Sequence, residues 1–289
     1  MDSERKYVLV LLGTAVVWAA SFIFVKISLG EVGPFNLALH RFLIAAPVLY
    51  MILKMSGRII PVSKQDLPGL VFLALTGVTL LYAVQFLALV YTTATNSSIL
   101  INTSAIFVSV LSFTVGEKLT GRKFVALILA FAGVVLTASK GNLEFLHAET
   151  LKGDLLMIFD GFLWALYTLG GKRLLERYNP ETLTVYAFAI GAVLLIPFAY
   201  AEGIASPVTF STMTWISIAF LALFCSVFGY VVWYSALSVM EATKVAVFVY
   251  LIPLFTAVMA YFALGEDIGP FTVLGGILIV LGVYLVERS

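Results

Sequence analysis

Two charged residues stand inside stretches of sequence that are otherwise almost entirely apolar. Arg41 lies in LALHRFLIAAPVLY (37–50), and a guanidinium keeps its charge at any physiological pH. Asp160 lies in MIFDGFLWALYTL (157–169). A charge in hydrocarbon is costly unless it is paired, hydrated or neutralised. A guanidinium and a carboxyl group in such places can pair with each other, bind a charged substrate or exchange a proton.

The composition indicates that the elements holding these residues lie in a membrane. The chain has 289 residues, of which 62% are hydrophobic and 11% charged, whereas soluble domains carry about 25% charged residues. None of the 50 positions between Asp66 and Glu117 is charged, and about 20 apolar residues suffice for one spanning helix. We therefore predict an all-α, multi-pass protein in the lipid bilayer. A net charge of +1 gives no case for nucleic-acid binding.

Charges and turn residues divide the chain into ten apolar segments that we expect to be transmembrane helices. They span residues 7–29, 35–54, 68–90, 95–115, 121–139, 151–172, 180–200, 212–237, 242–264 and 269–286. On the side of the N-terminus the loops and helix ends hold 13 lysines and arginines, and on the other side they hold three, Lys26, Lys140 and Lys152. Because cytoplasmic loops are rich in these residues, both termini are expected in the cytoplasm, with the protein in the cell membrane.

The second half of the chain repeats the first. AVVWAASFIFVK (15–26) aligns with GFLWALYTLGGK (161–172) at a spacing of 146 residues, and YAVQFLAL (82–89) aligns with YVVWYSAL (230–237) at a spacing of 148. Gly116-Glu117 likewise matches Gly265-Glu266 at a spacing of 149. An ordered series of matches is not expected by chance, so the sequence predicts a duplicated unit.

Each copy of the unit holds five helices, and five is odd. The second copy must therefore enter the membrane from the other side, which predicts an inverted repeat with domains 1–140 and 141–289. Inverted repeats build secondary transporters that bind substrate near the bilayer midplane. In this arrangement Lys26 and its repeat mate Lys172 fall at opposite edges of the membrane, and Lys26 is expected to keep its stem in lipid.

Several motifs resemble the EamA-type repeat of the drug/metabolite transporter superfamily. They are W-x-x-S-F-x-x-x-K (18–26) followed by Pro34 and Arg41-Phe42, then FVSVLSFTVGEKLT (107–120) and PLFTAVMAYFALGE (253–266). The resemblance implies ten helices, an inverted repeat, a central cavity, and the export or import of amino acids, other metabolites or drugs, by proton coupling or facilitated diffusion. The two copies differ at Ala187, where Arg41 would repeat, and at Ser104, where Pro253 would pair.

The two intramembrane charges have competing interpretations. Arg41 lies seven residues beyond Pro34 and so roughly 10 Å deep, where it could snorkel to the interface or face a cavity. Asp160 lies nine residues beyond Leu151 and so roughly 13 Å deep. A protonated Asp160 could make a structural hydrogen bond; alternatively Asp160 titrates in the cavity or pairs with Arg41. We expect both residues to bind substrate and Asp160 to couple transport to pH.

Aromatic, amide and hydroxyl side chains recur at mid-span positions in both halves. Trp164 lies one helical turn from Asp160, on the same face. Rings for stacking and a few polar groups on such faces suit a substrate cavity, although each ring alone could equally be packing or part of the interfacial belt. The predicted lining residues, besides Arg41 and Asp160, are Trp18, Ser21, Tyr82, Gln85, Asn102, Trp164, Tyr167, Tyr230, Trp233, Tyr234 and Tyr250.

The remaining sequence features narrow the function. No phosphate-binding G-x-x-x-x-G-K-[ST] motif or zinc-binding H-E-x-x-H motif occurs, so we expect no cofactor and no enzyme activity. We predict a secondary, alternating-access transporter, an exporter as is commoner in the superfamily, for small molecules such as amino acids, since opposite charges and aromatic walls suit a zwitterion. Protons are the expected coupling partner. The alternatives are other metabolites or drugs as substrates, or a facilitative uniporter or channel; oligomeric state stays open.

Overall fold

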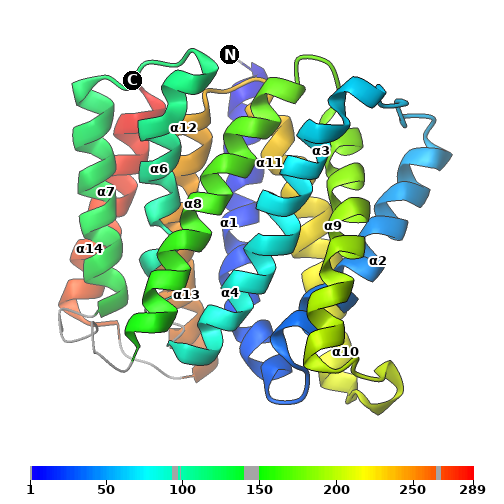
Figure 1. Cartoon of the computed structure of the whole chain (residues 1–289). Coiled ribbons are helices and arrows are strands. Elements are labelled where there is room, and N and C mark those ends of the chain that lie inside the picture. Colours follow the sequence, from blue (N-terminus) through cyan, green and yellow to red (C-terminus); the bar gives the residue numbers. More distant parts are fainter. Residues whose placement is uncertain (1, 93–96, 98, 140–149, 265–267) are drawn as a thin grey trace.

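The structure is a bundle of helices (Figure 1). The computed structural model describes residues 2–92, 97, 99–139, 150–264 and 268–289, and all regular secondary structure within them is helical, as predicted. The α-helices are α1 (Asp2–Leu29), α2 (Pro34–Met55), α3 (Leu67–Ala74), α4 (Leu80–Tyr91), α6 (Thr103–Leu111), α7 (Gly121–Ser139), α8 (Leu151–Leu174), α9 (Pro180–Glu202), α10 (Thr212–Phe220), α11 (Gly229–Leu237), α12 (Ala242–Ala246), α13 (Leu251–Leu264) and α14 (Pro270–Glu287).

Most of the helices belong to membrane spans. Eight helical stretches of the described residues are long and apolar enough to cross a bilayer. The expected fifth span coincides with α7, and the expected fourth begins at residues 95–96, outside the described part of the chain. Both termini lie at the same end of the bundle, the top of Figure 1. We call this end the terminal face and the other end the opposite face.

Matching irregularities occur in the two halves. π-helical turns replace α-helix at Leu75–Thr79, between α3 and α4, and at Leu221–Phe228, between α10 and α11. The next span of each half is interrupted too, by a turn at residues 101–102 before α6 and by a 3₁₀ segment, Val247–Tyr250, between α12 and α13. The positions correspond at the repeat spacing of the sequence. Such irregular turns are frequent at functional sites.

The π-helical turns offer backbone carbonyls to side chains of the other half. Tyr230 Oη donates a hydrogen bond to the Gly77 carbonyl at 2.7 Å, and Trp18 Nε1 donates to the Cys225 carbonyl at 3.0 Å. Gly77 and Cys225 occupy equivalent positions in the repeat alignment. Each half therefore bonds to the irregular turn of the other, which joins the two halves around the centre of the bundle.

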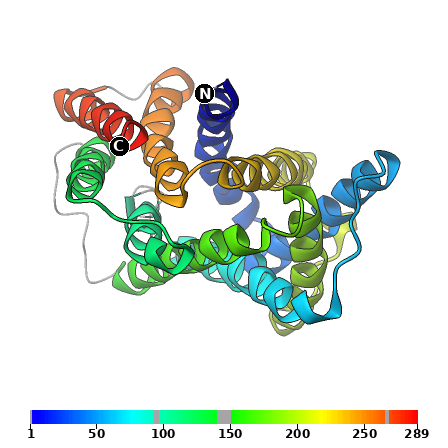
Figure 2. The same cartoon turned by 90° about the horizontal axis from the view of Figure 1, so that it is seen from above.

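Glycines let two helices meet at the edge of the bundle, where α7 and α14 lie side by side (Figure 2). A Cβ atom on Gly133 would lie 2.6 Å from the Gly275 carbonyl oxygen, and a Cβ on Gly282 would lie 2.7 Å from the Ala126 carbonyl oxygen. Small residues commonly allow such close approach of membrane helices. The obstructing atoms belong to the backbone of the facing helix and cannot turn aside.

The substitution Gly133→Ala is therefore expected to lower stability. Overpacking of this kind typically costs about 1–3 kcal/mol, which thermal unfolding in detergent would show as a lower Tm. Gly13→Ala is the matched control, because a Cβ on Gly13 in α1 would meet nothing within 4 Å, and alanine in an exposed helix is neutral to about 1 kcal/mol stabilising. Identical melting of both variants would contradict the packing argument.

Candidate functional site

A cavity lies among helices of both halves. Its volume is about 70 Å³, well below the roughly 300–1,000 Å³ of sites that enclose drug-sized ligands. The cavity is therefore narrow in this conformation and must widen to hold such a ligand. Its lining residues are Trp18, Ser21, Phe22, Arg41, Leu81, Tyr82, Gln85, Ile101, Ser104, Trp164, Cys225, Val249 and Ile252.

Arg41 lies in the cavity wall and not at the membrane interface. Its side chain is only 2% exposed. The Nε group donates to Ser226 Oγ at 2.7 Å, and Nη2 donates to Tyr82 Oη at 2.9 Å. The guanidinium carbon lies 4.1 Å from the centre of the Tyr82 ring, a cation–π distance. Because Ser226 belongs to the second π-helical turn, that irregular turn helps to hold the arginine.

Asp160 lies behind the cavity wall. It is fully buried, and Gln85 Nε2 donates to its Oδ2 atom at 2.8 Å. Its Oδ1 atom has no hydrogen-bond partner among the described residues. The ion pair with Arg41 that the sequence allowed does not form in this structure. Tyr82 and Gln85 stand one helical turn apart on α4, and each binds one of the two charged residues instead.

Packed rings from both halves adjoin the cavity. The ring centres of Trp18, Trp164 and Trp233 lie 5.1–5.5 Å from one another, within the range of favourable aromatic contacts. Tyr167 and Tyr234 stack at 4.8 Å. The aromatic cluster comprises Trp18, Trp164, Tyr167, Tyr230, Trp233 and Tyr234. Of these predicted lining residues, only Trp18 and Trp164 reach the cavity itself.

Two other predicted residues also lie away from the cavity lining. Asn102 and Tyr250 are fully buried at the paired interruptions of the fourth and ninth spans. The sequence reasoning missed other residues, among them Ser104 and Cys225, which do line the cavity. A signal for Ser104 was present, since it is a point where the two copies differ. Cys225 is a buried residue inside an apolar run, where the sequence carries no signal for a place in the lining.

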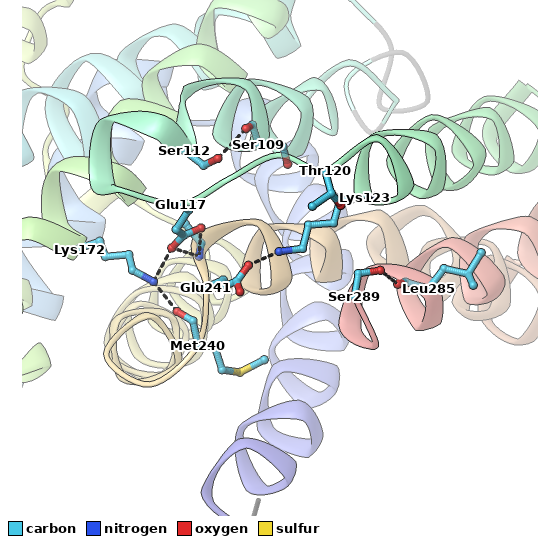
Figure 3. Close-up of polar contacts among 11 residues, drawn as sticks. Ser109, Ser112, Glu117, Thr120, Lys123, Lys172, Met240, Glu241, Leu285 and Ser289 are labelled. Atoms are coloured by element: carbon cyan, nitrogen blue, oxygen red, sulfur yellow. Dashed lines mark hydrogen bonds and ion pairs between the residues drawn. The ribbon is translucent and has the colours of Figure 1, made fainter.

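Charged residues join several helices at the terminal face (Figure 3). Lys172 Nζ, at the end of α8, lies 2.7 Å from Glu117 Oε1 and donates to the Met240 carbonyl at 2.5 Å. Glu117 also accepts the backbone N–H of Ala242 at 2.8 Å. A second ion pair joins Lys123 to Glu241. We call these residues the terminal-face lock, because they link the α6–α7 connection to α8 and to the start of α12.

The repeat mate of Lys172 makes a related contact at the opposite face. Lys26 Nζ donates to the Leu89 carbonyl at 2.6 Å and to the Thr92 carbonyl at 3.3 Å. Thr92 and Met240 are equivalent in the repeat alignment, so each lysine binds the end of the third span of its own half. The amine of Lys26 is thus bonded to protein. Glu266, the repeat mate of Glu117, lies outside the described residues.

Known proteins resemble the chain over almost its whole length. The profile of the EamA-like transporter family matches residues 5–139 and 151–288. An "uncharacterized transporter" of Archaeoglobus fulgidus is 53% identical over 285 residues, which cover 99% of this chain and 98% of the relative. A "probable amino-acid metabolite efflux pump" of Escherichia coli is 28% identical, covering 98% of this chain and 95% of the relative.

One solved structure has a similar fold. It covers 98% of this chain and 97% of its own, with a TM-score of 0.81 and 18% sequence identity. A likeness at that identity concerns the fold alone.

Proposed function

The chain belongs to the EamA-like transporter family, and from that premise we propose that it is a secondary carrier that moves small metabolites by alternating access. As a member of this family it is a multi-pass integral membrane transporter and not an enzyme. The observation that carries the proposal is the cavity around Arg41, to which both halves contribute residues. The aromatic cluster and the terminal-face lock would close this cavity on one side, as a carrier requires and an open channel does not.

Alternating access would follow from an inverted repeat with domains 1–140 and 141–289, whose boundary falls at residues outside the described part of the chain. The paired π-helical turns and paired interruptions support the repeat. In support of the inversion, α1 runs away from the terminal face whereas its repeat mate α8 runs toward it (Figure 1). The excess of lysine and arginine at the terminal face supports a cytoplasmic location for that face.

The substrate is a small metabolite, with amino acids as the first class to examine, and the direction is export. The E. coli relative, named an efflux pump for amino-acid metabolites, supports both choices. The substrate would contact the predicted residues that line the cavity, which are Trp18, Ser21, Arg41, Tyr82, Gln85 and Trp164. Aromatic faces would hold its apolar body, and Arg41 would bind its carboxylate.

Counter-flow in proteoliposomes tests the carrier. Vesicles holding the full chain are loaded with an unlabelled pool of amino acids and other small carboxylic acids, and entry of labelled members is followed. Saturable entry that internal substrate accelerates is expected. Entry that does not saturate and is indifferent to the internal pool would contradict a carrier and indicate a channel.

We also propose that Asp160 couples transport to protons, and this role can be tested separately. One oxygen of the buried carboxyl group has no hydrogen-bond partner among the described residues, and the other accepts from Gln85, which lines the cavity. A change in the protonation of Asp160 would alter that hydrogen bond, and so the position of the Gln85 side chain in the cavity wall. An imposed pH gradient is expected to stimulate wild-type flux, and Asp160→Asn to lose the stimulation while keeping counter-flow. Asp66→Asn, at the terminal face, is the control. Full pH-dependent transport by Asp160→Asn would contradict this role.

A further inference from the structure

The charge of the cavity indicates a class of substrate. Arg41 is the only formally charged group among the described lining residues. The ion pairs among the described residues do not include it. We propose that the cavity selects small monocarboxylates of net negative charge over the zwitterion and the cation with the same carbon skeleton. This inference rests on the carrier function proposed above, and it replaces amino acids with carboxylate anions as the preferred substrate class.

The guanidinium retains the capacity to bind a carboxylate. It has five N–H donors in a planar fork, of which one on Nε serves Ser226 and one on Nη2 serves Tyr82. Both partners are neutral, so the buried charge is not compensated by them. The remaining N–H groups can bind two carboxylate oxygens at once, which is the geometry that arginine favours.

A second donor belongs to a residue that lines the same cavity. Trp164 Nε1 has no hydrogen-bond partner among the described residues, although the side chain is only 7% exposed and lines the cavity. Buried polar groups are almost always hydrogen-bonded, so an unpartnered donor on a residue that lines a cavity is available to an acceptor on a ligand. An anionic ligand would supply acceptors both to this N–H and to Arg41.

The described lining residues include no carboxylate to pair with an ammonium group. Asp160 is not a lining residue, and Gln85, which does line the cavity, donates its amide N–H to Asp160. Ser21 Oγ donates to the backbone carbonyl of Trp18 at 2.6 Å. An amino acid would therefore bring its positive charge beside Arg41 without a carboxylate to pair with it among the described lining residues. The opposite charges that suggested a zwitterion from sequence do not both reach the cavity.

A matched series of ligands tests the inference on the purified full chain. The probes are 4-methylpentanoate, leucine, 4-methylpentanamide and 4-methylpentylamine, which share a six-carbon skeleton and differ in charge. Binding is followed by tryptophan fluorescence, because Trp18 and Trp164 line the cavity. The anion is expected to bind at least about 10-fold more tightly than leucine, as a charge-assisted bidentate contact without an opposing ammonium allows. The amine is expected not to compete.

Trp164→Phe identifies the second donor, because it removes the N–H while keeping a ring. We expect anion affinity to fall about 3- to 10-fold, the effect of one hydrogen bond to a charged group. The affinity for the amide should fall less, because its carbonyl oxygen is a neutral acceptor. Trp215→Phe is the control, since Trp215 lies on α10 outside the lining and is 37% exposed. Equal losses for anion and amide in Trp164→Phe would indicate packing only and overturn the role of this donor.

The outcomes separate this inference from the carrier function. Leucine or the amine binding as tightly as the anion, with saturable counter-flow, would overturn the charge selection and leave the carrier intact. Failure of all four probes to bind would overturn the assignment to small monocarboxylates, while counter-flow with the wider pool still decides the carrier function by itself.

Discussion

Arg41→Ala is expected to lower kcat/KM for counter-flow at least about 100-fold, because hydrogen bonds to a charged group contribute about 1.5–3 kcal/mol each and each 1.4 kcal/mol is tenfold. The loss should be functional and not a failure to fold. Arg41 is a buried cation held by neutral groups, and removing a buried charge that lacks a counter-charge relieves its desolvation cost. The Tm in detergent is therefore expected to change little.

Arg58→Ala is the matched control for this prediction. Arg58 pairs with Glu181 at 3.3 Å, but its side chain is 65% exposed, and exposed ion pairs typically contribute about 0–1 kcal/mol. Counter-flow should be near the parent value in this variant. Counter-flow by Arg41→Ala within about threefold of the parent would show that the arginine is structural, and the carboxylate-binding role would be wrong.

Breaking the terminal-face lock is the second large effect that we expect. Glu117→Gln removes the charge that holds Lys172 while leaving a carbonyl oxygen to accept the Ala242 N–H. An ion pair of this kind contributes about 1.5–3 kcal/mol, so the conformation open to the terminal face should rise in population about 10-fold or more. The reporter is Cys225, the only cysteine of the chain, which lines the cavity and is 1% exposed.

The measurement is the rate at which a membrane-impermeant methanethiosulfonate modifies Cys225 from the terminal face of oriented vesicles. The rate should rise about 10-fold in Glu117→Gln, and adding Lys172→Gln should raise it little further, because the two residues act as one contact. Arg177→Gln, which removes an exposed ion pair with Asp66, should leave the rate unchanged. Additive effects of Glu117→Gln and Lys172→Gln would mean that their contact does not hold this face closed.

Much of the fold could be predicted from apolar runs and turn residues. The expected eighth span, 212–237, coincides with the observed stretch Thr212–Leu237. The π-helical turns within it and within the third span could not be predicted, because a π-helical run has the same composition as an α-helical one. They depend on long-range contacts such as Tyr230 Oη to the Gly77 carbonyl. Proline often kinks or breaks a helix, but Pro47 and Pro197 lie inside the continuous helices α2 and α9.

The site was predictable only in part. Helical spacing places Arg41, Tyr82 and Trp164 on mid-span faces, and these do reach the cavity. Spacing does not show whether a face meets the cavity or a neighbouring helix, and so Tyr230 and Trp233 were placed in the lining although they lie in the aromatic cluster. Nor does sequence show which polar group binds each charge, as Gln85 binds Asp160 and Tyr82 binds Arg41.

The most direct test of alternating access is the modification of Cys225 from each face of the membrane, in the parent and in Glu117→Gln. If the cavity opens to one face at a time, the substitution should raise the rate from the terminal face and lower the rate from the opposite face, because the two open conformations share one population. Rates that rise together at both faces would indicate a continuous pore and would contradict the carrier.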